Sequence, residues 1–420
     1  MPHDTPLIAT VVAGLCLAFV FGMIAHRLKL PMIAGYLLAG VVIGPFTPGF
    51  VADQGIASEL SEVGVILLMF GVGLHFSVKD LISVRNIAVP GAVGQIALAT
   101  VIGVGVGLWM GWSYGAGLIF GLSLSVASTV VLLRALQDRH LDKTPRGKIA
   151  VGWLVVEDLA MVVALVLIPP LAGLLGGDVV PMEDGAREVA RLGIGPIAAT
   201  LLITAVKVTA FVVLMLVVGR KVIPAVLHYT AHTGSRELFR LAVLATALGV
   251  AFGSAYFFGV SFALGAFFAG MVMAESTLAS QAMREILPLR DAFAVLFFVS
   301  VGMLFNPAIL ITAPFALLVT VAVIILVKSA GAYGIMRSFG YAPGAALTIA
   351  ASLAQIGEFS FILIVMGLDL AIVPPEARDL VVAGALVSIL VNPLLFYLLD
   401  RRGLLQEPEP AVATPPGAAA

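Results

Sequence analysis

The chain is a succession of long apolar runs separated by short polar loops. Thirteen runs can be marked out, and most approach the length of about 20 residues that a helix needs to cross a bilayer. They lie at about 6–26, 30–46, 57–76, 87–111, 114–136, 147–172, 195–220, 237–258, 260–275, 288–305, 308–335, 343–368 and 378–399. This pattern predicts an all-α polytopic membrane protein with 13 transmembrane helices.

Composition supports a membrane protein and excludes a soluble one. Hydrophobic residues make up 61% of the chain and charged residues 11%, whereas a soluble domain carries about 25% charged residues. The single Cys16 excludes an internal disulfide and a cysteine-rich metal site. The chain has no HExxH motif, which argues against an intramembrane zinc enzyme, and we expect no enzymatic activity. We expect the lipid bilayer as its partner, no nucleic acid and no cofactor.

The loop charges predict the orientation of the chain. The loops after the odd-numbered runs, together with the C-terminal end, hold 18 of the 23 lysines and arginines, and the opposite side holds Arg187, Arg191 and Arg378. Positive residues gather on the cytoplasmic side of membrane proteins. We therefore expect a multi-pass membrane protein with an external N-terminus and a cytoplasmic C-terminus.

Two short segments recur in the second half of the chain. Residues 60–77 resemble residues 289–306, and at nearly the same offset Gly40 falls on Gly270 in a second short match. The identities of the longer match are Leu60/Leu289, Leu67/Leu296, Val72/Val301, Gly73/Gly302 and Phe76/Phe305. The matches predict that the first six runs are repeated as the last six.

The predicted transmembrane domain spans residues 1–402. It consists of a repeat at about 6–172, a linker helix at about 195–220 and a second repeat at about 237–399. Six helices return the chain to its starting side and the seventh crosses the membrane, so the two repeats must be inverted. Inverted repeats are typical of secondary transporters whose site lies near the membrane midplane.

Runs 5 and 12 occupy equivalent positions in the two repeats, and both contain polar groups at mid-membrane depth. Irregular backbone is tolerated there only where it is buried or lines a cavity. Run 5 contains Ser123, Ser125, Ser128 and Thr129, and run 12 contains Gln355, Gly357, Glu358 and Ser360. We predict two discontinuous helices that cross each other and offer carbonyl and hydroxyl groups to a cation.

The sixth run contains two adjacent acids, Glu157 and Asp158. A charged side chain at the bilayer centre costs about 3 kcal/mol or more, so such residues mark ion or proton sites by default. For Asp158 we favour a site for a monovalent cation and a proton over a structural acid tied to Lys328. Adjacent helical residues point about 100° apart. Glu157 is therefore either a second proton site or an acid paired with a neighbouring helix.

Three further polar residues lie inside predicted helices. Lys328 needs an acidic partner, for which Asp158, Glu157 and Glu358 are candidates, and it acts either as a counter-charge or directly in coupling. Glu358 balances the positive N-terminal end of a half-helix or binds the ion. Gln355 belongs to the same polar stretch.

Several of these residues form a combination that resembles a known family. Ser128-Thr129, Glu157-Asp158, Lys328 and the stretch 355–359 resemble the monovalent cation–proton antiporter superfamily, most of all its Kef-type potassium–proton antiporters. Supporting runs are 30–45 and 67–74. The similarity covers about residues 6–400.

The resemblance implies a thirteen-helix fold with a dimerisation domain and a mobile core domain that works by elevator-type alternating access. It implies a homodimer that transports K⁺ or Na⁺ against H⁺. In the family, the second acid of the pair carries the ion and the proton, which places that role on Asp158. Hydroxyl residues beside it correspond to Ser128 and Thr129.

Two features depart from the family. Relatives often carry Gln, Asn or Asp at the position of Glu157, which leaves the charge stoichiometry open. No GxGxxG motif of a nucleotide-binding regulatory domain follows Arg402. The Pro/Ala-rich residues 403–420 are interpreted as a disordered tail or as the cut edge of a longer protein.

The same sequence pattern leaves three other transport functions to consider. A Na⁺/H⁺ antiporter on the same fold would need only a different site size. A Na⁺-coupled organic-anion symporter shares the crossed helices, and ten spans would favour it. A ligand-gated K⁺ channel needs a selectivity filter, and the chain has no TVGYG sequence.

Overall fold

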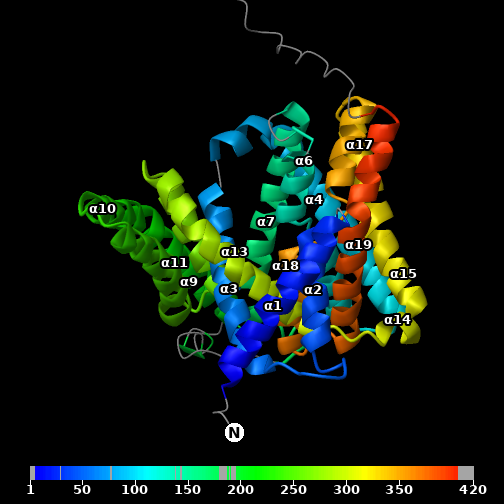
Figure 1. Ribbon diagram of the computed structural model, residues 1–420, viewed down its shortest axis with the longest axis horizontal. Helices are drawn as coiled ribbons and strands as arrows, with labels where there is room; N and C mark the ends of the chain where they lie inside the picture. The colour runs from blue at the N-terminus through cyan, green and yellow to red at the C-terminus, as the bar shows by residue number, and fades with distance from the viewer. Residues whose placement is uncertain are drawn as a thin grey trace, which may run out of the picture.

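The computed structural model describes residues 5–28, 30–75, 78–137, 139–141, 144–178, 187–188, 190 and 195–404, and almost all of them are helical (Figure 1). In this part of the chain, nine helices are long and apolar enough to cross a membrane, and four further apolar helices are shorter. The predicted all-helical polytopic fold is therefore confirmed. The tail predicted at 403–420 lies outside the described residues from 405 onward.

In the first half of the chain, the described part of residues 6–171 forms seven helices, of which two short ones are the parts of one broken run. These helices are α1 (Pro6–Arg27), α2 (Met32–Ile43), α3 (Gln54–His75), α4 (Val78–Trp109), α5 (Tyr114–Ser125), α6 (Thr129–Gln137) and α7 (Pro145–Leu171). Side-chain caps define two of these helix starts. Ser113 Oγ accepts a hydrogen bond from Ala116 N, and Thr144 Oγ1 accepts one from Gly147 N, which satisfies amides that have no partner inside the helix.

The second half repeats this alternation of long, short and broken helices. It contains α11 (Arg236–Phe258), α12 (Phe262–Ala274), α13 (Ala279–Met303), α14 (Ile309–Thr312), α15 (Pro314–Ala322), the π-helical turn η2 (Val323–Val327), α16 (Lys328–Ser338), α17 (Pro343–Ser352), α18 (Glu358–Asp369) and α19 (Pro375–Arg401). Ser235 and Ser261 cap α11 and α12 in the same way as Ser113 caps α5.

The linker between the halves is longer than the sequence predicts. α9 (Pro196–Leu214) continues through the π-helical turn η1 (Met215–Gly219) into α10 (Arg220–His232). The predicted helix ends at about residue 220 because Arg220 and Lys221 interrupt the apolar run. These charges do not end the helix. They mark the point where it changes from apolar to amphipathic, with Ile223 and Leu227 buried on one face.

The helices group into two bundles that pack mainly within themselves. The scaffold bundle comprises α1–α3 and α9–α13, and the core bundle comprises α4–α7 and α14–α19. In Figure 1, α10 and α11 of the scaffold lie at the left edge, and α15 and α19 of the core lie at the right. The division separates the elements that carry the predicted site residues, all in the core, from the rest.

Glycines allow two close helix crossings in the scaffold. A Cβ on Gly40 of α2 would lie 2.0 Å from the Val299 carbonyl oxygen of α13, and one on Gly270 of α12 would lie 2.2 Å from the Phe70 carbonyl oxygen of α3. No side chain fits between backbones this close. α2 therefore packs directly on α13, and α12 packs directly on α3.

The core bundle contains the two predicted interruptions. α5 ends at Ser125 and α6 begins at Thr129, while α17 ends at Ser352 and α18 begins at Glu358. The two breaks touch, because a Cβ on Gly357 would lie only 2.4 Å from Ser128 Cα. The interruption of both helices, predicted from their polar residues, is confirmed.

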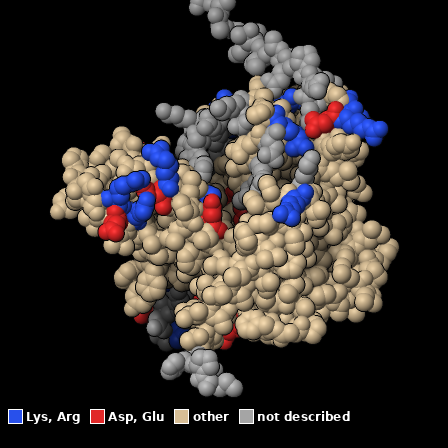
Figure 2. All heavy atoms as spheres, in the orientation of Figure 1, with Lys and Arg blue, Asp and Glu red and all other residues tan. Residues whose placement is uncertain are grey.

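Charged residues concentrate at one end of the molecule. Figure 2 shows most of the visible lysines and arginines in the upper half of the view, in one group at the left over α10 and α11 and in another at the upper right, where α19 ends and α17 begins. Below them the surface is mostly uncharged. We call the upper end the basic end.

Candidate functional site

The carboxylate of Asp158 lies on α7, beside the point where the broken helices cross. The residue is 2% exposed. Its Oδ2 accepts a hydrogen bond of 3.1 Å from the hydroxyl of Thr129, the first residue of α6. Its Oδ1 is buried and has no hydrogen-bond partner among the described residues. A buried polar atom without a partner is rare and calls for a ligand or another explanation.

Glu157, the adjacent acid, has a different environment. It is fully buried, and both of its oxygens accept hydrogen bonds. Oε1 receives one of 2.7 Å from the side-chain nitrogen of Gln95 on α4, and Oε2 receives one of 3.0 Å from the backbone nitrogen of Ala127 in the break between α5 and α6. Glu157 therefore holds α4, α7 and the broken helix together.

Lys328 begins α16 immediately after the π-helical turn η2 and is fully buried. Its ammonium donates a hydrogen bond of 3.0 Å to the carbonyl oxygen of Gln355 in the second break. Glu157 is the carboxylate with which its charge interacts. Of the three acids left open as partners from the sequence, Glu157 is therefore the one favoured by electrostatics, although no acid among the described residues lies within ion-pair distance of Lys328. The π-helical turn adds a residue to the helix and so rotates the residues after it, which directs Lys328 inward.

Gln355 joins the two breaks. Its side-chain oxygen accepts a hydrogen bond of 2.9 Å from Ser128 N, and its side-chain nitrogen donates one of 3.2 Å to Ser128 O. The amide thus satisfies both backbone groups of one residue in the opposite break. Ser128 Oγ in turn donates a hydrogen bond of 3.2 Å to Glu358, the first residue of α18. These bonds compensate backbone that no helix satisfies.

The ends of the half-helices match the charges around them. The N-terminal end of a helix carries a partial positive charge and the C-terminal end a partial negative one. Asp158 is bonded at the start of α6 through Thr129, and Glu358 opens α18. Lys328 is bonded to Gln355 O, just beyond the end of α17. The crossing therefore favours negative charge on one side and positive charge on the other.

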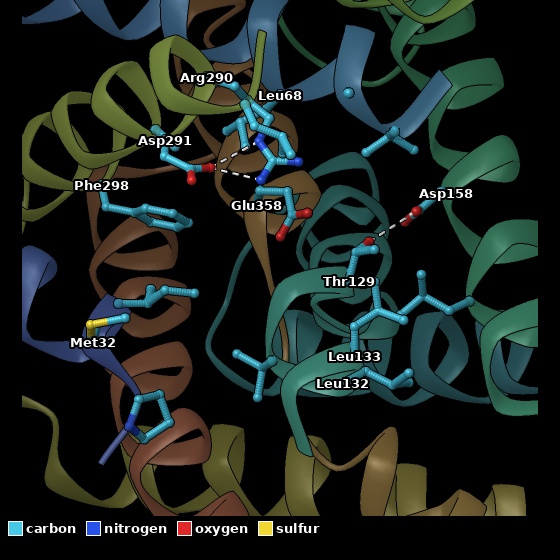
Figure 3. A pocket seen from close by; sticks show the side chains of 18 of the residues that line it. Met32, Leu68, Thr129, Leu132, Leu133, Asp158, Arg290, Asp291, Phe298 and Glu358 are labelled. Carbon is cyan, nitrogen blue, oxygen red and sulfur yellow. Dashed lines mark hydrogen bonds and ion pairs between the residues drawn. The ribbon is translucent and has the colours of Figure 1, made fainter. Parts of the chain in front are cut away.

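A cavity of about 650 Å³ reaches the site between the two bundles. Its core wall includes Thr129, Asp158 and Glu358, and its scaffold wall includes Arg290 and Asp291 of α13. Figure 3 shows Asp158 with Thr129 on one side of this space and the pair Arg290–Asp291 on the other. The remaining lining is mostly apolar. Glu157 and Lys328 are not among the lining residues.

The lining of the cavity continues toward the basic end. It includes the exposed Gln137 at the end of α6, together with Pro31 and Met32 at the start of α2. The cavity therefore extends from Asp158 to the exposed end of α6 at the basic end.

The seven residues singled out in the sequence all meet at the crossing, where they form three groups. Asp158, Thr129 and Glu358 line the cavity, whereas Glu157 and Lys328 lie behind it. Ser128 and Gln355 connect the breaks. The roles of these residues in transport remain predictions, because geometry alone does not test them.

Sequence reasoning missed two residues that the geometry brings in. Gln95 is a lone amide inside a long apolar run, fully buried against Glu157. A polar residue at that depth was a signal that could have been used. Arg290 lies inside the predicted run 288–305, and no sequence pattern indicates that it lines a cavity.

Comparison with known proteins gives consistent results. Residues 15–398 match the family described as sodium/hydrogen exchanger, transmembrane. The putative cation/proton antiporter YbaL of Escherichia coli (strain K12) is 57% identical over 401 residues, which cover 96% of this chain and 70% of that protein. K(+) efflux antiporter 6 of Arabidopsis thaliana is 32% identical over 396 residues, which cover 94% of this chain and 62% of that protein.

A solved structure shares the fold. The sodium proton antiporter MjNhaP1 from Methanocaldococcus jannaschii superposes with a TM-score of 0.70 at 18% identity, covering 96% of this chain and 99% of that chain. The match of the family to nearly the whole chain, together with the relative at 57% identity, establishes membership. The chain belongs to the sodium/hydrogen exchanger transmembrane family.

Proposed function

We propose that this protein is a secondary antiporter that exchanges a monovalent cation, K⁺, for H⁺. The observation that carries the proposal is the Asp158 carboxylate, which lines the cavity, lies beside two helix breaks and leaves Oδ1 without a hydrogen-bond partner among the described residues. Membership of an exchanger family and the similarity to a putative cation/proton antiporter and to a K(+) efflux antiporter support it.

The chemistry of exchange arises from the competition of two cargoes for one carboxylate. A carboxylate out of water is stabilised either by a proton or by a cation with oxygen ligands. Asp158 Oδ1 would bind the cation, and the hydroxyl of Thr129 and the carboxylate of Glu358 would complete its coordination with Ser128 Oγ nearby. Because one group cannot hold both cargoes, binding of one releases the other.

Glu157 and Lys328 take no direct part in this exchange. Glu157 already has a donor on each oxygen, and Lys328 supplies a compensating charge behind the site. Gln355 positions the breaks. With Asp158 as the one exchanging acid, one K⁺ would replace one H⁺ and the exchange would be electroneutral.

The choice of K⁺ rests on the resemblance to Kef-type proteins and on the K(+) efflux antiporter of Arabidopsis thaliana among the relatives. The family description and the solved sodium proton antiporter favour Na⁺ instead. Na⁺/H⁺ exchange at the same site is therefore the second candidate function.

Alternating access would occur by an elevator movement of the core bundle against the scaffold bundle. The two bundles pack mainly within themselves, and the cavity lies between them. Asp158, Thr129 and Glu358 all belong to the core, so they would move together. The observed arrangement would be the state open toward the basic end.

The topology supports thirteen crossings in two inverted repeats. Nine long helices, the short α2 and α12, and the two broken pairs α5–α6 and α17–α18 would account for the crossings. The scaffold crossings support the symmetry. α2 meets α13 at Gly40, and α12 meets α3 at Gly270, so the partners are exchanged between the halves. The basic end would face the cytoplasm, with the N-terminus outside.

We further propose a homodimer in a bacterial inner membrane. The scaffold helices 198–232 and 236–258 are the least covered of the long helices together with α1, and 11% and 22% of their apolar windows are buried. They are therefore available for contact with a second copy. We also propose the domain division predicted from the sequence, with repeats at about 6–172 and 237–399. A nucleotide-binding regulatory domain, usual in Kef-type proteins, would act from a separate segment or chain.

The test is proton flux in proteoliposomes that contain a pH-sensitive dye. K⁺, Na⁺, Li⁺ and Rb⁺ are added in turn to wild-type protein and to Asp158→Asn. The proposal predicts a pH change with K⁺ that the variant lacks. A response to Na⁺ alone would show that the exchanged cation is Na⁺ and not K⁺. No response to any cation would reject antiport and favour a symporter or a channel.

A further inference from the structure

Arg290 lies on the scaffold wall of the cavity, opposite the carboxylates of the core. Its guanidinium forms an ion pair with Asp291, with Nη2 at 2.7 Å and Nε at 3.0 Å from Asp291 Oδ1. Both residues line the cavity. Figure 3 shows Arg290 above Glu358, with Asp291 on its other side. Arg290 thus has one acidic neighbour on its own helix and another across the cavity.

The local packing directs Arg290 into this position. A Cβ on Gly71 of α3 would lie 2.8 Å from Arg290 Cδ, so the aliphatic part of the side chain runs against a helix surface that only glycine leaves open. The side chain of Arg290 is 23% exposed, against 64% for Asp291. The arginine remains charged at any physiological pH, and its charge reaches Glu358.

Arg290 and Glu358 belong to different bundles. Among the described residues, the ion pair of Arg290 is with Asp291 and not with Glu358. Glu358 instead accepts a hydrogen bond from Ser128 and is 2% exposed. An ion pair between Arg290 and Glu358 would therefore connect the core directly to the scaffold, and this connection would have to break before the core could move.

We propose that Arg290 is an interlock that prevents the empty core from crossing the membrane. The inference rests on the proposed function of Asp158. When K⁺ or H⁺ occupies the site, its positive charge offsets the acids, and Arg290 stays with Asp291. When the site is empty, the uncompensated charge of Asp158 and Glu358 attracts Arg290, which pairs with Glu358 and holds the core in place.

Such an interlock accounts for coupling between the two fluxes. An antiporter must move when it carries cargo and must not move when it is empty, because an empty return step turns exchange into a leak. A cation fixed to the scaffold makes this distinction by electrostatics alone. The interlock also requires a partner for Arg290 when the site is occupied, and Asp291 is that partner.

The first experiment measures leak and exchange on the same proteoliposomes. The leak is proton efflux from acidic vesicles without K⁺ or Na⁺ on either side, with tetraphenylphosphonium to compensate charge. Arg290→Gln should raise this leak about fivefold or more while K⁺-driven exchange persists. Arg290→Lys, which keeps the charge, should stay near the wild-type leak. Arg284→Gln is the matched control, because Arg284 lies on α13, is exposed and does not line the cavity.

The second experiment uses Asp291→Asn, which leaves Arg290 with Glu358 as its acidic neighbour. Exchange should become several-fold slower, and the double variant Arg290→Gln/Asp291→Asn should restore it. A merely structural role for Arg290 would not produce this rescue.

Wild-type leak in Arg290→Gln with exchange intact, or no rescue in the double variant, overturns the interlock. Loss of exchange in a monodisperse Arg290→Gln protein also overturns it, because Arg290 would then be needed for transport itself. Absence of exchange in the wild-type protein overturns the proposed function instead.

Discussion

The two adjacent acids of α7 lie in different regions of the core and have different surroundings. On the side of α4, Glu157 is enclosed by Gln95 and Ala127, and its charge interacts with Lys328. On the side of the cavity, Asp158 has one donor, Thr129, and one oxygen without a partner among the described residues. Adjacent intramembrane acids therefore need not share a role, because a helix directs them to different surroundings.

The energetic consequences of the two environments are opposite. A buried charge that is paired and hydrogen-bonded becomes a liability when a partner is removed. A buried group that lacks partners contributes little stability, and its retention needs another reason. Variants on the α4 side should therefore affect folding, and variants on the cavity side should affect transport.

The largest expected effect is that of Asp158→Asn. Exchange should fall to the level of protein-free liposomes, because asparagine binds neither a proton nor a cation by charge. The melting temperature in detergent should be unchanged or raised, because the change removes a buried carboxylate. Measurable exchange by this variant would show that another group binds the cation and the proton.

The next largest effect is a loss of stability on the α4 side of the core. Lys328→Gln should destabilise the protein by about 3 kcal/mol, because it leaves Glu157 without its compensating charge. Thermal unfolding in detergent measures the loss. The double variant Glu157→Gln/Lys328→Gln should recover most of it. A double variant no more stable than Lys328→Gln would show that the two residues do not act as a pair.

A smaller loss is expected for Gln95→Leu. Glu157 Oε1 loses its donor, which should reduce stability by about 1–3 kcal/mol, while exchange at saturating K⁺ is retained. Thr100→Val on the same helix is the control, because the buried Thr100 hydroxyl has no partner among the described residues. Loss of exchange at unchanged melting temperature would give Gln95 a direct part in transport.

The smallest effect belongs to the cavity side. Thr129→Val keeps the shape of the side chain but removes the hydroxyl that bonds Asp158. The half-saturating K⁺ concentration should rise about fivefold, as expected for one hydrogen bond. Thr246→Val on α11, whose hydroxyl bonds a backbone carbonyl far from the site, should leave it unchanged. Equal half-saturating K⁺ concentrations for the two variants would show that Thr129 does not contribute to the site.

The sequence was informative where a residue conflicts with its surroundings. Acids in an apolar run at 157–158, hydroxyls at 128–129 and Gln-Ile-Gly-Glu at 355–358 each signalled an interruption or a site. These signals are local. They predicted the two broken helices and the residues gathered at them.

Partnerships between distant residues could not be derived in the same way. The partner of Lys328 stayed open among three acids, and Gln95 was overlooked, because both contacts depend on how helices rotate about their axes. The π-helical turn before Lys328 changes that rotation, and its apolar sequence gives no sign of it. The position of Arg290 opposite Glu358 depends on packing between two bundles that share no local sequence.

Proton release on cation binding tests the central claim most directly. K⁺ is added to weakly buffered, detergent-solubilised protein, and the protons released per protomer are measured with a pH dye. Wild-type and Glu157→Gln protein should release the same amount, up to about one proton, and Asp158→Asn should release none. Release that persists in Asp158→Asn, or that disappears in a folded Glu157→Gln protein, would contradict a single shared site at Asp158.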